Sequence, residues 1–278
     1  MARKNILDIT AQKFAAKKLA LRRMILRKLA TRRLAARKTA ALGMVMLLLG
    51  GCHVAQLTTL YTDETSVEEN GIRYDVDYIN GQKTGFFLDQ KYNRRAAAAL
   101  APGRRVLDCC THTGAFALNC AQAGAEHVTA VDISKDAVEL TRRNAALNGL
   151  SDKVEVQQAD VFDLLTTLAQ EKKHPYDYII LDPPAFTKSG ATVKNAYRGY
   201  KEINLKAMKL LPRGGYLATC SCSHFMTPNL FCQMLREAAA DAAVSLRQIE
   251  DRRQSPDHPI LWGVPETEYL KFYLFQIV

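Results

Sequence analysis

From about residue 71 onward, the sequence predicts an α/β fold with a doubly wound, mostly parallel β-sheet. Short apolar runs rich in Val, Ile and Leu alternate with longer amphipathic segments, which is the pattern of strands joined by helices. Gly124 and Gly149 close two of the amphipathic segments, as glycines commonly do at helix ends. An aspartate ends three of the apolar runs, and the ends of parallel strands meet at one edge of a sheet.

The predicted elements follow one another in a regular order. A hairpin comes first, with strands in 72–81 and 83–90 joined through an Asn-Gly turn. Helices are predicted at 94–101, 114–124, 135–150, 161–172, 200–211 and 230–242. Strands of the main sheet are predicted at 104–110, 127–134, 154–160, 176–184, 214–222, 245–252 and 268–278.

The positive charge of the chain is concentrated in its first 40 residues. The net charge is +10, but residues 1–40 hold 13 of the 38 Lys and Arg residues and one of the 28 acidic residues. Basic pairs recur every five positions from Lys17 to Lys38 and would point to all sides of a helix. We favour a solvated basic arm that does not pack on a core, with a phosphate-binding arm as the alternative.

The apolar stretch at residues 41–52 is too short to span a bilayer as a helix. It ends in "LLGGC", which looks like a lipoprotein cleavage box, so residues 24–52 could form an export signal. The long, charged segment before it argues against that interpretation. We therefore expect a cytoplasmic protein without stable membrane association.

The seven cysteines do not have the spacing of a zinc site or a disulfide framework. No CxxC pair occurs, and the number is odd. A reducing compartment fits this pattern, and no metal is predicted.

Three aspartates mark the predicted ligand-binding edge of the sheet. Asp108, Asp132 and Asp160 each end a strand, and Asp132 lies where a carboxylate can accept ribose hydroxyls. Gly114 lies in the turn after the first of these strands, where backbone must approach a ligand. Together they predict a nucleoside ligand, although a single aspartate at a strand end often only caps the next helix.

Residues 71–278 resemble the class I S-adenosylmethionine-dependent methyltransferases. More closely, they resemble the bacterial 23S ribosomal RNA cytosine-5 methyltransferases that carry an N-terminal PUA domain. The resemblance covers about three quarters of the chain. It rests on "GQKTGFFLDQ" (81–90), "VLDCCTHTGAFAL" (106–118), "VDIS" (131–134), "QADVFDLL" (158–165), "LDPPAF" (181–186), "RGYKEIN" (198–204), "CSCS" (220–223) and "SPDHPILWGVPETEYLK" (255–271).

The resemblance implies a Rossmann-like, seven-stranded sheet with an antiparallel closing strand, preceded by a β-hairpin. It implies a domain order of 1–60 as an anomalous basic segment without PUA-like sequence, 61–90 as hairpin and cofactor loop, and 91–278 as the methyltransferase domain. It also implies S-adenosylmethionine as cofactor and ribosomal RNA as partner. The cofactor contacts that it implies are Lys83, Thr84, Gly85, Asp89, Gln90, Asp108, Thr113, Gly114, Asp132, Ser134, Asp160 and Asp182.

Cytosine-5 methylation requires a thiolate, because carbon 5 becomes nucleophilic only after a nucleophile adds at carbon 6. Cys222 matches the nucleophile of the family and Cys220 does not. Either cysteine could also be a small core residue. Asp182 is expected to stabilise charge at the ring of the base. Pro183, Pro184 and Phe186 are expected to contact the base.

Two other functions remain open on the sequence. "DPPAF" (182–186) approaches a motif of enzymes that methylate amino or ring nitrogens without a covalent adduct. Alternatively, the sheet could be a non-catalytic module that binds S-adenosylmethionine or RNA.

Overall fold

The computed structural model describes residues 64–77, 85–171, 175–187 and 189–278. Asp63–Val278 form one compact unit. The predictions for residues 1–60, for Lys83 and for Thr84 lie outside the described residues. Within the described part of the chain, no helix combines the length and the apolar character needed to cross a membrane.

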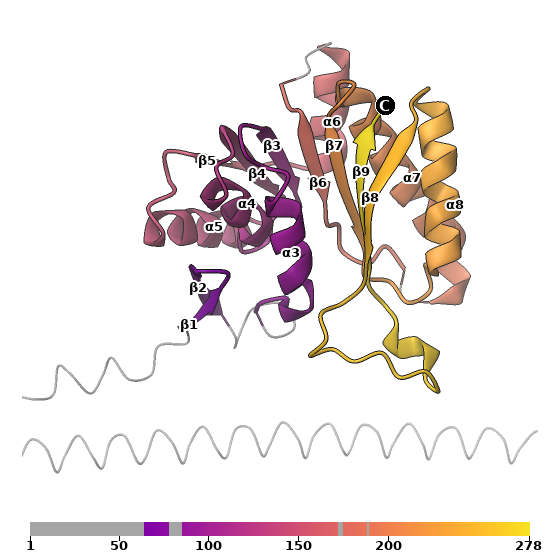
Figure 1. The fold of residues 1–278 in the computed structure, drawn as a ribbon, viewed down its shortest axis with the longest axis horizontal. Helices are drawn as coiled ribbons and strands as arrows, with labels where there is room; N and C mark the ends of the chain where they lie inside the picture. Colours follow the sequence, from indigo (N-terminus) through magenta and orange to yellow (C-terminus); the bar gives the residue numbers. More distant parts are fainter. Residues whose placement is uncertain (1–63, 78–84, 172–174, 188) are drawn as a thin grey trace, which may run out of the picture. The chain divides into compact units, whose positions relative to one another are not determined.

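A seven-stranded sheet forms the centre of the unit, in the order β5-β4-β3-β6-β7-β9-β8 (Figure 1). Strands β3 to β7 are parallel, whereas β9 runs antiparallel to both β7 and β8. The strands are β3 (Arg105–Cys109), β4 (His127–Asp132), β5 (Val154–Gln158), β6 (Tyr178–Leu181), β7 (Tyr216–Ser221), β8 (Leu246–Arg252) and β9 (Lys271–Ile277). The predicted fold class is therefore confirmed, including the antiparallel closing strand.

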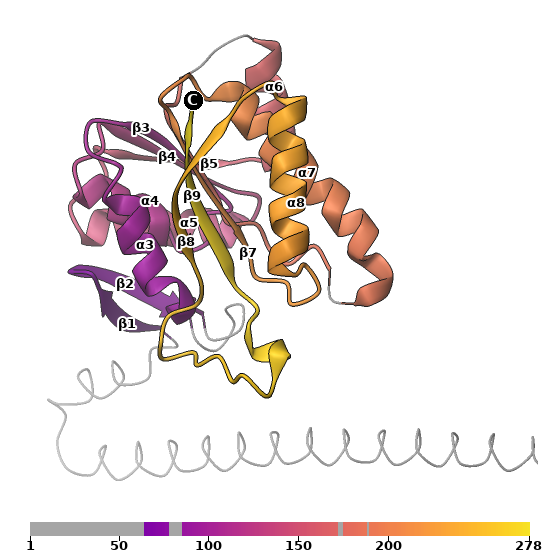
Figure 2. The same ribbon diagram turned by 45° about the vertical axis from the view of Figure 1, so that its right-hand side comes forward.

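Helices cover both faces of the sheet, as expected for a doubly wound fold (Figure 2). The helices are α3 (Lys91–Ala98), α4 (Ala115–Gln122), α5 (Lys135–Leu147), α6 (Val161–Gln170), α7 (Val193–Leu210) and α8 (Pro228–Asp241). Three short 3-10 helices are η2 (Leu88–Gln90), η3 (Gly190–Thr192) and η4 (Pro265–Thr267). One core contains residues of α3, α4 and α5, and the other contains residues of α6, α7 and α8.

The hairpin before the sheet differs from the prediction. Its strands are β1 (Glu64–Glu69) and β2 (Ile72–Asp77), so the segment starting at Ile72 pairs with the residues that precede it. Asn70 and Gly71 form the turn with φ of 56° and 78°, the left-handed geometry that suits a two-residue hairpin. Residues 85–90 instead form a bend and η2, which leads directly into α3.

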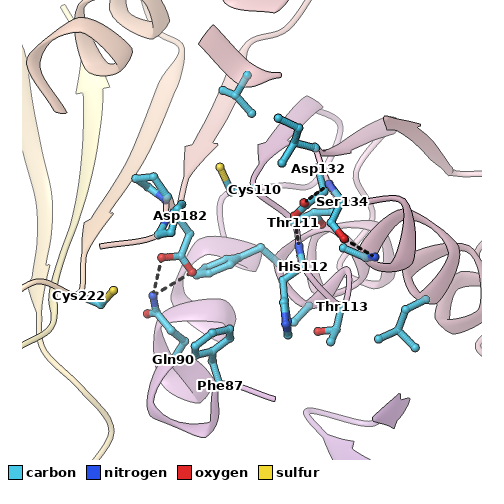
Figure 3. Close-up of a pocket in the computed structure, with 18 of the residues that line it drawn as sticks. Phe87, Gln90, Cys110, Thr111, His112, Thr113, Asp132, Ser134, Asp182 and Cys222 are labelled. Atoms are coloured by element: carbon cyan, nitrogen blue, oxygen red, sulfur yellow. Dashed lines mark hydrogen bonds between the residues drawn. The ribbon is translucent and has the colours of Figure 1, made fainter. Parts of the chain in front are cut away.

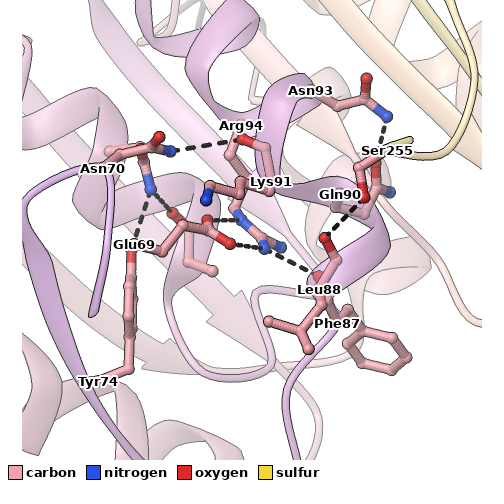
Figure 4. Close-up of polar contacts among 12 residues, drawn as sticks. Glu69, Asn70, Tyr74, Phe87, Leu88, Gln90, Lys91, Asn93, Arg94 and Ser255 are labelled. Atoms are coloured by element: carbon pink, nitrogen blue, oxygen red, sulfur yellow. Dashed lines mark hydrogen bonds and ion pairs between the residues drawn. The ribbon is translucent and has the colours of Figure 1, made fainter. Parts of the chain in front are cut away.

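A buried ion pair ties this hairpin to the beginning of α3 (Figure 4). Arg94 donates to both carboxylate oxygens of Glu69, at 2.5 and 2.6 Å, and also to the carbonyl of Phe87 at 2.8 Å. The Arg94 guanidinium also lies 4.7 Å from the ring centroid of Phe86. The charged contacts therefore hold residues 86 and 87 in place at the edge of the sheet.

Candidate active site

A cavity of about 570 Å³ lies at the carboxyl ends of the parallel strands (Figure 3). Residues from the segments after β3, β4, β5, β6 and β7 line it, together with residues of η2. The predicted site residues in its lining are Asp89, Gln90, Thr113, Asp132, Ser134, Asp160, Asp182, Pro183, Pro184, Phe186 and Cys222. The topology thus brings residues that are more than 130 positions apart in sequence to one cavity.

The loop after β3 turns sharply beneath the cavity. Cys110, His112 and Gly114 all have positive φ, at 63°, 55° and 82°. This backbone geometry is easy for glycine and strained for the other two residues. A Cβ on Gly114 would also lie 2.8 Å from Thr141 Cγ2, so the close approach of this loop to α5 requires glycine.

Asp108 stabilises that loop from below and does not line the cavity. Its side chain is fully buried and accepts hydrogen bonds from Thr111 Oγ1 at 2.6 Å and from the Ala117 N–H at 3.0 Å. Burial raises the pKa of Asp108 to about 7, although the hydrogen bond from Thr111 opposes the shift. Its two hydrogen bonds support the loop, and its predicted role as a cofactor contact stays a prediction.

Asp132 presents a carboxylate that the backbone orients. It accepts hydrogen bonds from the N–H groups of His112 at 3.0 Å and Ser134 at 2.9 Å (Figure 3). Asp160 also lines the cavity, and its Oδ1 caps α6 by accepting from the Phe162 N–H at 2.7 Å. Capping and ligand binding are thus compatible at Asp160, because capping through Oδ1 leaves Oδ2 available.

Gly85 packs closely against the end of β2. Its φ is 79°, and a Cβ there would overlap the carbonyl oxygen of Asp77 and lie 2.7 Å from Val76 Cγ1. It is not part of the cavity lining, so its observed role is to let the backbone of this loop approach β2.

Asp182 is held between two segments of the cavity wall. The side-chain amide of Gln90 donates to both of its carboxylate oxygens at 3.1 Å, and Cys220 on the neighbouring strand also influences this carboxyl. Burial is the largest influence on this carboxyl, and the nearby charge of Asp89 adds to it. Together they raise the pKa of Asp182 to about 6. The carboxyl can therefore carry a proton close to neutral pH.

The two cysteines near the end of β7 have different surroundings. Cys220 is fully buried within the strand, and burial raises its thiol pKa well above the ordinary value. Strand β7 ends at Ser221, and Cys222 is half-buried and lines the cavity. Figure 3 shows its sulfur on the same side of the cavity as Asp182 and Gln90. No disulfide involves the cysteines of the described residues.

Phe186 forms part of the cavity wall from a packed position. Its ring centroid lies 4.5 Å from that of Tyr200 and 6.0 Å from that of Phe162. Pro183 is buried and Pro184 exposed, although both contribute to the lining. One face of the Phe186 ring is therefore already covered by aromatic neighbours.

Phe87 and Cys110 also line the cavity, although they were not predicted as site residues. Phe87 follows Gly85 in a segment that was expected to be a strand, and its ring packs edge-on to His112 at 4.9 Å between centroids. Cys110 lies in the same turn as Gly114, directly after β3. This position in the turn was the signal that could have identified it as a cavity residue.

Comparison with known proteins identifies the family. Residues 10–276 match the family model described as S-adenosylmethionine-dependent methyltransferase. The chain belongs to this methyltransferase family. It is 46% identical over 206 residues to ribosomal RNA large subunit methyltransferase I of Shewanella denitrificans, covering 74% of this chain and 52% of that protein. It is 44% identical over 212 residues to the protein of the same name from Aeromonas hydrophila, covering 76% and 53%.

The chain therefore spans about half the length of these methyltransferase relatives. A solved structure from Streptococcus mutans, described as a SAM-dependent methyltransferase, superposes with a TM-score of 0.69 at 25% identity. That superposition covers 78% of this chain and 56% of the other. The fold seen here is thus the fold of the methyltransferase family.

The cavity residues fit S-adenosylmethionine, the cofactor named by the family. Asp132 offers oriented oxygens that suit hydroxyl groups, and Asp89 is buried with its Oδ1 unpartnered within the described residues. The other oxygen of Asp89 accepts from the Tyr269 hydroxyl at 2.7 Å. An unsatisfied buried carboxylate oxygen is costly, and a cationic ligand group would relieve that cost. Within the described residues, no group of His, Cys, Asp and Glu could hold a metal ion.

Proposed function

We propose that the chain methylates carbon 5 of a cytosine in large-subunit ribosomal RNA, with Cys222 as the nucleophile. The observation that carries the proposal is that Cys222 and Asp182 line the same cavity as Asp132. The names of the relatives, which are 44 to 46% identical to this chain, support ribosomal RNA as the substrate.

Within this proposal, the cofactor contacts are divided along the cavity. Asp132 accepts the ribose hydroxyls, Asp160 accepts from the adenine amino group, and Asp89 and Gln90 contact the methionine end. Lys83 and Thr84 would complete the loop over that end. S-adenosylmethionine supplies a methyl group on a sulfonium, which needs a carbon nucleophile beside it.

Cys222 and Asp182 create that nucleophile. The Cys222 thiolate adds to carbon 6 of the cytosine, and the carbon–carbon π electrons shift to make carbon 5 nucleophilic. Asp182, with its pKa raised to about 6, donates a proton or hydrogen bond to the ring nitrogen on which charge develops. After methyl transfer, a base removes the carbon-5 proton and the thiolate leaves.

A trapping experiment tests the adduct. RNA that contains 5-fluorocytosine cannot lose a proton at carbon 5, so the Cys222 adduct should persist and shift on a denaturing gel. Cys222→Ala should abolish both the shift and 5-methylcytosine formation, whereas Cys220→Ala should retain the shift. Methyl transfer that survives in Cys222→Ala would favour nitrogen methylation, and cofactor binding without any methyl transfer would favour a non-catalytic module.

For the basic segment 1–40, the alternative to a solvated arm is contact with RNA phosphates. It carries 13 Lys and Arg residues, and cations that neutralise phosphates make binding salt-dependent. Deleting residues 1–40 should flatten the dependence of RNA affinity on salt concentration. An unchanged slope would favour a solvated arm that does not touch the RNA.

A further inference from the structure

A buried lysine lies behind the loop that carries Cys222. Lys271 begins β9, pairs with Ser221 across the antiparallel ladder, and has an exposed fraction of 0%. A buried lysine is uncommon because the removal of an ammonium from water is costly. Lys271 ends the stretch 255–271 that carries the family resemblance, and the sequence analysis assigned no role to it.

The ammonium of Lys271 links the loop after β7 to the residues just before β9. Its Nζ donates to the carbonyl of Ser223 at 2.6 Å and to the carbonyl of Tyr269 at 2.8 Å. The hydroxyl of Ser223 also donates to the carbonyl of Thr187 at 2.9 Å, in the segment after β6. The residue that follows Cys222 is therefore fixed by two hydrogen bonds, while Cys222 itself faces the cavity.

Three charged or ionisable side chains influence the charge of Lys271, namely Cys222, Arg253 and Glu268. Lys271 forms no ion pair with a carboxylate in the described part of the chain. Glu268 favours its charged form and Arg253 opposes it, but these two side chains already bond each other at 2.8 Å. Burial lowers the pKa of Lys271 to about 8, and among the charges a negative Cys222 is the largest influence in the opposite direction.

We propose that Lys271 is a positioning residue for Cys222, which holds the loop at Ser223 and places a buried positive charge near the thiol. This inference rests on the proposed function for its catalytic meaning. Electrostatic linkage is reciprocal, so a cation that is favoured by the thiolate favours the thiolate in return. Lys271 would thus favour the thiolate form of Cys222 without touching the RNA.

The rate of Cys222 alkylation by iodoacetamide tests this inference in the full chain, without RNA or cofactor. Mass spectrometry of the Cys222 peptide at several pH values gives the pH midpoint of its reactivity. Lys271→Gln removes the charge but keeps a donor, and should move that midpoint upward and slow alkylation at pH 7 by about tenfold. Lys271→Arg, which keeps the charge, should restore reactivity. Lys209→Gln, at an exposed position on α7, is the matched control.

Two comparisons separate this role from a loss of folding. The half-buried Cys232 on α8 reports global opening in the same sample, so its alkylation should be unchanged in Lys271→Gln. An equal acceleration of Cys232 and Cys222 in Lys271→Gln would overturn the inference, as would a Cys222 midpoint equal to that of the unmodified protein. Because the readout needs no methyl transfer, an RNA that is not methylated would count against the proposed function alone.

Discussion

The two sides of the cavity each have a buried cation, and the two cations differ in their hydrogen-bond partners. Arg94, on the side of η2, is 2% exposed and forms two hydrogen bonds to the carboxylate of Glu69. Lys271, behind the end of β7, donates to two carbonyl groups and has no carboxylate partner in the described residues. A cation with its own counter-ion serves the architecture, whereas one without it can influence the charge of a neighbouring reactive group.

The largest expected effect is on the reaction itself, at the residue between the two sides. Asp182→Asn keeps the size of the side chain but removes its acidic proton, so the methylation rate should fall by about 10²- to 10⁴-fold. Affinity for S-adenosylmethionine should change little. Single-turnover methylation and calorimetry measure the two quantities, with the exposed Asp152→Asn as control. A loss of cofactor affinity with an unchanged rate would assign Asp182 to the cofactor and not to the base.

The next effect concerns stability on the Arg94 side. Glu69→Ala leaves the buried guanidinium without its counter-ion and should lower the free energy of unfolding by about 3–5 kcal/mol. Urea unfolding measures this change. Glu68→Ala, at the exposed neighbouring position on β1, should cost less than about 0.5 kcal/mol.

Replacing both members of the pair sharpens this comparison. Glu69→Leu combined with Arg94→Leu removes both buried charges, so it should be less destabilising than Glu69→Ala. A double variant as unstable as Glu69→Ala would show that the remaining contacts of Arg94, to Phe87 and Phe86, dominate its contribution.

A smaller effect is expected at the ribose end of the cavity. Asp132→Ala should weaken cofactor binding by about 1.5–3 kcal/mol, the scale of losing hydrogen bonds to a charged acceptor. It should leave the alkylation of Cys222 unchanged, because the thiol lies at the other end. Calorimetry measures the affinity, and Asp163→Ala, exposed in the first turn of α6, serves as control. An unchanged affinity would refute the assignment of Asp132.

These contrasts match what the sequence could and could not predict. The strand-end positions of Asp132 and Asp160 followed from the alternation of strands and helices, because parallel strands end at a common edge. The hairpin partner was wrong because the sequence holds Asn-Gly at both 70–71 and 80–81, and local turn preference alone does not choose between them. The burial of Lys271 was not predictable from its own strand, since it depends on carbonyl groups supplied by the loop after β7.

The smallest effect is a change of slope, and it tests the support beneath the ribose side. The pKa of Asp108 is about 7 in the folded protein, whereas an exposed aspartic acid has an ordinary pKa of about 4. Between these values the folded state keeps a proton that the unfolded state has lost. This carboxyl therefore makes stability decrease as pH rises from about 4 to 7, by at most about 1.4 kcal/mol per pH unit, with no further change above.

Asp108→Asn cannot ionise, so the free energy of unfolding should depend less on pH across that range. Urea unfolding from pH 4 to 8 measures the slope, with the exposed Asp152→Asn as control. The same slope in Asp108→Asn and in the unmodified protein would mean that Asp108 is ionised beneath the loop throughout this range.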